Sequence, residues 1–158
     1  MDRTKLKILA ATIQEQQRLI EAIYRSIAER KKSYTKNRIV LESLAYQLHN
    51  LYSAFEELFR VCARYFENHV TEEIDWRKEL LDRMTFANKD GRPRLISKPA
   101  YELLDQLHGF RHAFLHDYSV ELEAKKIKIV LKKALALKRI YKKDIANFLK
   151  QLQAQNNG

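Results

Sequence analysis

The stretch 41–66, LESLAYQLHNLYSAFEELFRVCARYF, decides the fold of this chain. Apolar side chains recur in it every three or four residues, which is the period of one face of an α-helix. No glycine or proline interrupts the pattern, so we expect one long helix over about residues 36–68. The face predicted to be buried consists of Leu41, Leu44, Leu48, Leu51, Phe55, Leu58, Cys62 and Phe66.

The same period continues on both sides of this stretch. A first helix is expected over 3–32, with Gln16 interrupting its apolar stripe. At 1.5 Å per residue each of these two helices would be about 45 Å long, and we expect them to pack as an antiparallel hairpin. A shorter helix should follow over 72–86, with Thr71 as N-cap. Its inward-facing residues would be Trp76, Leu80 and Met84.

Turn-forming residues mark only one clear loop, 88–97, which contains Gly91 and Pro93. A fourth helix should begin near Ser97 and end near residue 116, and a last helix, capped by Ser119, should run to about residue 152. The sequence therefore predicts an all-α protein. The core face of the last helix would be Ile127, Val130, Ala134, Leu137, Tyr141, Ile145, Phe148 and Leu152.

Length and charge point to a single domain, 1–158, with a partner that carries negative charge. The net charge is +10, and residues 119–158 contribute +7 of it. A basic stripe opposite the core face of the last helix could bind a polyanion, or it could be an ordinary solvated helix face. Its residues are Lys128, Lys132, Arg139, Lys143 and Lys150. The polar tail, about 151–158, is expected to fray.

Cysteine usage and apolar runs bear on the cellular location. The lone cysteine, Cys62, excludes an internal disulfide and is expected to be a small core residue. Residues 1–14 lack the apolar stretch of a signal peptide, and no apolar run of about 18 residues could span a bilayer. We therefore expect a cytoplasmic protein with no membrane association.

The segment most suggestive of chemistry places Arg111, His116 and Tyr118 at the spacing R-x4-H-x-Y. An arginine can hold a phosphodiester through paired hydrogen bonds, and a histidine can transfer protons near neutral pH. Spacing alone is weak evidence, because Arg64 and His69 form a second R-x4-H. The tyrosine distinguishes the two copies, since Thr71 takes its place in the other one.

Segments 52–59 (YSAFEELF) and 109–118 (GFRHAFLHDY) resemble a HEPN-domain toxin of the HepT type. The resemblance implies a four- to five-helix bundle with long antiparallel helices, dimerised so that both motifs meet in one cleft. It also implies metal-independent RNA cleavage without a cofactor, by Arg111 and His116. The implied partner is a minimal nucleotidyltransferase antitoxin that transfers AMP to Tyr118, as in a type VII-like toxin–antitoxin pair.

The helix geometry is consistent with such a dimer. Five residues turn through about 500°, so Arg111 and His116 would point some 140° apart on a straight helix. A two-fold dimer would bring two arginines and two histidines to one phosphate. Two auxiliary residues stay open: His112, which occupies a position that is often small and polar in the family, and Glu57, which could orient a site residue or form a surface ion pair.

Three other interpretations remain. His108, His112 and His116 recur every four residues and could bind a metal, although we expect none, and activity that survives a chelator would support that. The bundle could be a non-catalytic platform or substrate of a nucleotidyltransferase. It could also be a basic nucleic-acid-binding protein that uses the lysine stripe alone, with an affinity that falls steeply with salt.

Overall fold

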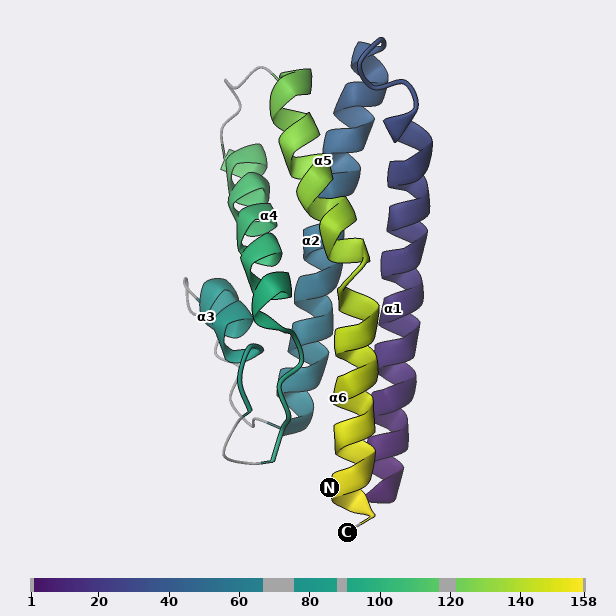
Figure 1. The fold of residues 1–158 in the computed structure, drawn as a ribbon, viewed down its shortest axis with the longest axis vertical. Helices are drawn as coiled ribbons and strands as arrows, with labels where there is room; N and C mark the ends of the chain where they lie inside the picture. Colours follow the sequence, from purple (N-terminus) through teal and green to yellow (C-terminus); the bar gives the residue numbers. More distant parts are fainter. Residues whose placement is uncertain (1, 67–75, 88–90, 117–121, 158) are drawn as a thin grey trace.

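The computed structural model describes all residues except 1, 67–75, 88–90, 117–121 and 158, and at 76–78 and 115–116 it describes the backbone only. The described residues form helices and connecting turns with no strand, which confirms the all-α prediction (Figure 1). The helices are α1 (Arg3–Lys31), α2 (Arg38–Phe66), α3 (Trp76–Arg83), α4 (Lys98–His116), α5 (Ala124–Lys138) and α6 (Tyr141–Asn156). Within this part of the chain no helix is long and apolar enough to cross a membrane.

Helices α1 and α2 form the predicted hairpin along the full length of the molecule (Figure 1). The side chain of Asn37 caps α2 by accepting hydrogen bonds from the backbone N–H groups of Ile39 (2.9 Å) and Val40 (3.3 Å). Gln16, which interrupts the apolar stripe of α1, donates its side-chain amide to the backbone oxygen of Ala54 at 2.9 Å. The interruption is therefore a polar contact that links the two helices.

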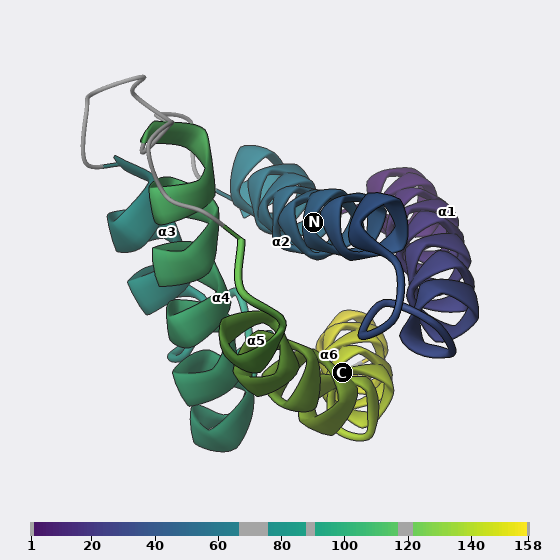
Figure 2. The same cartoon turned by 90° about the horizontal axis from the view of Figure 1, so that it is seen from above.

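The remaining long helices close the bundle around α2. Helix α4 packs on α2, α5 packs on both, and α6 lies against α1 (Figure 2). Aromatic contacts join these helices. The Tyr141 ring stacks on the Tyr24 ring with 5.8 Å between their centres, and it forms a T-shaped pair with the Phe55 ring at 5.3 Å. Cys62 is fully buried, as expected, and burial raises the pKa of its thiol to about 12.

The prediction of the last helix was wrong in two respects. The observed helix begins at Ala124, after the N-cap Glu123, and an interruption around Arg139 and Ile140 divides it into α5 and α6. At the break the backbone N–H of Arg139 donates to the carbonyl oxygen of Ala136, and that of Ile140 donates to the carbonyl oxygen of Leu137. Each of these hydrogen bonds spans three residues, as in a 3₁₀-helix. Ser119, the expected cap, lies outside the described residues. The predicted core face is nevertheless buried on both helices except at Val130, which is only partly buried; its buried members are Ile127, Ala134, Leu137, Tyr141, Ile145, Phe148 and Leu152.

Two other boundaries also differ from the prediction. Helix α6 continues through Asn156, so the tail expected to fray is helical up to that residue, where burial of Leu152 holds it against the core. Helix α3 ends at Arg83 and not at residue 86. A turn follows it, in which the backbone oxygen of Met84 accepts hydrogen bonds from the N–H groups of Leu95 and Ile96. Thr71, its expected cap, is outside the described residues, while Leu80 and Met84 are buried as predicted.

The segment from Gly91 to Ser97 positions the start of α4. Gly91 has φ of 93°, which favours glycine, and Arg92 is buried with Nη2 donating to the backbone oxygen of Arg83 at 3.1 Å. Ser97 donates its N–H (2.9 Å) and its hydroxyl (2.8 Å) to one carboxylate oxygen of Asp144. These contacts tie the start of α4 to α6 and fix the helix that carries the motif arginine.

Candidate functional site

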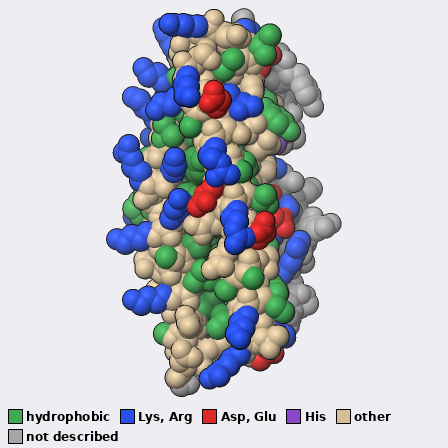
Figure 3. Space-filling model, turned by 90° about the vertical axis from the view of Figure 1, so that its right-hand side faces the viewer, with side chains coloured by type: hydrophobic (Ala, Val, Ile, Leu, Met, Phe, Trp, Pro, Cys, Tyr) green, Lys and Arg blue, Asp and Glu red, His purple; other side chains and the backbone are tan. Residues whose placement is uncertain are grey.

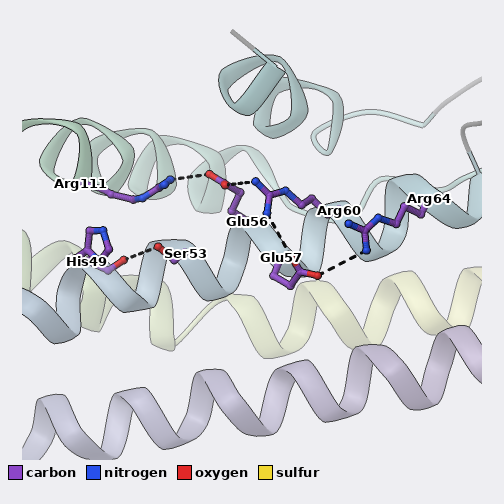
Figure 4. Close-up of polar contacts among 7 residues, drawn as sticks. All are labelled: His49, Ser53, Glu56, Glu57, Arg60, Arg64 and Arg111. Carbon is purple, nitrogen blue, oxygen red and sulfur yellow. Dashed lines mark hydrogen bonds and ion pairs between the residues drawn. The ribbon is translucent and has the colours of Figure 1, made fainter. Parts of the chain in front are cut away.

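Arg111 lies on the face of α4 that packs against α2, with only 8% of its surface exposed. Its Nη1 donates to Oε2 of Glu56 at 2.8 Å (Figure 4). Its guanidinium carbon lies 5.6 Å from the centre of the Tyr52 ring. Glu56 is 3% exposed. The arginine is thus held between a buried carboxylate and an aromatic face, in a charge-assisted hydrogen bond that fixes its direction.

Glu56 also bonds to a second arginine. Its other oxygen, Oε1, accepts from Nη2 of Arg60 at 2.9 Å, while Nη1 of Arg60 lies 3.4 Å from Glu57. Arg64 lies 3.9 Å from the other oxygen of Glu57, so charges alternate along α2 away from Arg111 (Figure 4). Exposure of the arginine side chains rises along this row, from 10% at Arg111 to 26% at Arg60 and 63% at Arg64. The row leads from the buried site to the solvent.

The arrangement has an energetic consequence for the site. A buried carboxylate is costly to desolvate unless cations and hydrogen bonds compensate it, and here Arg111 and Arg60 both do so. The three arginines and two glutamates of the row leave one positive charge in excess. The site is therefore ordered before any anion binds, while its net charge still favours one.

His49 is a further ionisable group beside Arg111, one helical turn before Ser53 on α2 (Figure 4). Its ring centre lies 5.6 Å from that of Phe114 on α4 and 6.3 Å from that of Tyr46. Burial, together with the charge of Arg111, lowers the pKa of His49, and a contact with Asn50 opposes this only in part. The imidazole is therefore neutral at pH 7.

The other predicted site residues are placed as follows. His116 is the last residue of α4, five residues after Arg111, but its side chain and all of Tyr118 lie outside the described residues. His112 is exposed on α4. Glu57 contacts Arg60 and Arg64, as a surface ion pair would, and the neighbouring Glu56 is the carboxylate that meets Arg111.

The basic stripe lies on the surface, as predicted. Its members on α5, at the break after α5 and on α6 are all exposed: Lys128, Lys132, Arg139, Lys143 and Lys150. The face of the molecule in Figure 3 carries many more Lys and Arg side chains than acidic ones. This surface can attract a polyanion over a wide area without specifying one.

Metal-binding geometry is not found in the described part of the chain, where no three His, Cys, Asp or Glu side chains gather. His108, one of the three regularly spaced histidines, forms a T-shaped ring pair with Tyr52, with 5.4 Å between the ring centres. Two hollows, of about 390 and 310 Å³, lie where the start of α1 meets the end of α6. Neither is lined by Arg111, Glu56 or His49, so the site described above is a separate surface.

A family model described as HepT-like protein matches residues 43–152, which is more than half of the chain. The chain belongs to the HepT-like protein family. The match begins in α2, ends in α6 and includes both Glu56 and Arg111. It confirms the resemblance to a HepT-type HEPN domain and indicates a component of a HEPN-type toxin–antitoxin pair. Neither a curated protein nor a solved structure matches the chain.

Sequence reasoning missed two members of this HepT-like site, Glu56 and His49. A signal for Glu56 exists, because it follows Phe55 and lies four residues after Tyr52, on the buried side of α2. A carboxylate at such a position needs a cation from another element. No signal in the sequence marks His49, since only the packing of α4 on α2 brings Arg111 close to it.

Proposed function

We propose that this HepT-like protein is the endoribonuclease toxin of a type VII-like toxin–antitoxin pair, and that Arg111 and His116 carry out metal-independent RNA cleavage. The observation that carries the proposal is the fixed position of Arg111, bonded to buried Glu56 on the helix that ends at His116. A guanidinium already oriented by a carboxylate can stabilise charge on a phosphate without rearranging first.

Cleavage would use the RNA's own 2'-hydroxyl as nucleophile. The reaction needs a base for the hydroxyl proton, an acid for the departing 5'-oxygen and positive charge beside the phosphorane oxygens. Arg111 supplies the charge and His116 transfers a proton. Their directions differ by about 140° on a straight helix, so we propose that a homodimer brings the motifs of two protomers into one cleft.

Control of the toxin would act on Tyr118. A nucleotidyltransferase antitoxin would transfer AMP to the phenolic oxygen, adding bulk and negative charge next to the phosphate position. Like-charge repulsion and occlusion would then exclude RNA. The exposed basic side chains of α5 and α6, such as Lys128 and Lys132, would attract the RNA substrate.

A second function has one observation in its favour. Arg111 is largely buried and bonded to Glu56, as an arginine with a purely structural role would be. A non-catalytic HEPN platform that serves only as partner or substrate of a nucleotidyltransferase would show the same contact. Cleavage activity distinguishes the two functions, because the platform has none.

The test is cleavage of a transfer-RNA or total-RNA pool by purified protein in the presence of a chelator. Wild type is compared with His116→Ala and with Arg111→Lys, which keeps the charge opposite Glu56 but loses the planar fork of donors. We expect both variants to fold, judged by thermal unfolding, and to lose cleavage. Absence of cleavage by the unmodified wild type would favour the platform, and AMP transfer to Tyr118 would then be measured.

A further inference from the structure

His49 is a histidine outside the R-x4-H-x-Y motif that nevertheless lies at the same helix interface as Arg111. It projects from α2 toward α4, where its ring meets Phe114, three residues after Arg111 (Figure 4). Tyr52, which underlies the guanidinium of Arg111, is three residues after His49 on α2. The imidazole and the guanidinium therefore belong to one site within one protomer.

The hydrogen bonding of His49 defines which nitrogen can accept a proton. Nδ1 lies 3.4 Å from Oδ1 of Asn50, and a carbonyl-type oxygen can only accept. This contact favours the neutral tautomer that carries its proton on Nδ1, which leaves the lone pair on Nε2. Nε2 is buried and has no hydrogen-bond partner among the residues that the structure describes. A buried acceptor without a donor is uncommon and calls for a functional explanation.

The surroundings keep this lone pair available near neutral pH. Among the side chains that the structure describes, the titratable groups recorded against the ring are Tyr46 on α2 and Arg111 on α4. The burial of the ring and, to a smaller extent, the positive charge of Arg111 both disfavour the imidazolium, as already described. Tyr46, which stacks on the ring, is 54% exposed and lies outside the core, so this side of the imidazole is close to solvent.

We propose that His49 is the general base of the reaction in the same protomer as Arg111, an assignment that rests on the proposed function. Nε2 of His49 takes the proton of the 2'-hydroxyl while the 2'-oxygen forms its bond to phosphorus. The bond from phosphorus to the 5'-oxygen breaks, and that oxygen takes a proton from the imidazolium of His116. The products are a 2',3'-cyclic phosphate and a 5'-hydroxyl, and exchange with water restores both histidines.

This assignment changes what the dimer has to provide. With two motif histidines alone, base and acid would both come from His116 residues of different protomers. With His49 as base, each Arg111 already has a proton acceptor next to it on α2. The second protomer then needs to contribute only the acid to each phosphate.

The test compares the cleavage rate of wild type with His49→Gln over pH 4.5–8.5, with chelator present. His108→Gln is the matched control, because His108 is also half-buried between α2 and α4, packed on Tyr52. We expect kcat of His49→Gln to fall by about 10²- to 10⁴-fold with KM little changed. The wild-type rate should fall as the pH drops through the lowered pKa of His49, and this acid-side dependence should disappear in the variant.

A second variant separates chemistry from folding. His49→Ala leaves a space, and added imidazole should restore part of its rate while leaving Arg111→Lys unrescued. Cleavage by His49→Gln at the wild-type rate, with His116→Ala inactive, would overturn the assignment and leave the proposed function in place. No cleavage by the wild type would overturn both, and equal losses in His49→Gln and His108→Gln without imidazole rescue would show a packing role only.

Discussion

Replacement of Glu56 by alanine should destabilise the protein strongly, because it leaves Arg111 buried without its carboxylate. Breaking one side of a buried ion pair typically costs about 3–5 kcal/mol. For a domain of 150–250 residues each kcal/mol lowers the melting temperature by roughly 2–4 °C, so the expected drop is roughly 6–20 °C. Arg60, which loses the same partner, adds little, since its side chain is 26% exposed and retains Glu57.

The measurement is thermal and urea unfolding followed by circular dichroism, with Glu57→Ala as control. Glu57 is the adjacent residue on α2, but its side chain is 40% exposed and its ion pairs lie at the surface, so its loss should cost less than about 1 kcal/mol. The double variant Glu56→Met with Arg111→Met removes both charges of the pair. It should regain much of the stability that Glu56→Ala loses. Equal stabilities of Glu56→Ala and Glu57→Ala would refute the reasoning.

Three further outcomes follow from other contacts. Because the pKa of His49 is lowered in the folded state, the unfolded chain binds more protons than the folded protein below about pH 6.5. The free energy of unfolding should therefore fall as the pH drops through this range, and it should fall less in His49→Gln. Urea unfolding at each pH measures both. Asp144→Ala removes both hydrogen bonds from Ser97 and should cost about 1.5–3 kcal/mol in the same assay. Lys128→Gln and Lys132→Gln should each reduce the salt dependence of RNA binding by about one phosphate contact, measured by fluorescence anisotropy from low to high salt.

The fold could be predicted largely from apolar spacing, because each long helix buries one continuous stripe. The stripe of α2 is buried from Leu41 to Cys62 as its sequence indicates. The break between α5 and α6 could not be predicted, since Arg139 and Ile140 are ordinary helix residues with neither glycine nor proline beside them. The apolar stripe continues through both α5 and α6, and only the direction of the helix axis changes at the break.

The site was less predictable because its contacts join residues far apart in the chain. Glu56 and Glu57 are neighbours of the same type, and their roles differ only because α4 lies on the side of α2 toward which Glu56 points. Sequence reasoning named Glu57 as a possible auxiliary residue, one position away from the carboxylate that contacts Arg111. One residue on a helix is a rotation of about 100°, which is enough to exchange the buried and the surface position.

The Glu56–Arg111 contact also affects how an activity assay on this chain should be interpreted. A phosphate that binds Arg111 must share the guanidinium with Glu56, because Nη1 already donates a hydrogen bond to the Glu56 carboxylate at 2.8 Å. Arg111→Ala would remove the phosphate ligand and at the same time leave Glu56 with Arg60 as the cation within reach, so loss of cleavage could reflect loss of folding. Arg111→Lys keeps a charge beside the carboxylate and the double methionine variant removes both charges. A protein that is stable in both forms and active in neither would therefore show that the guanidinium is required for the reaction itself.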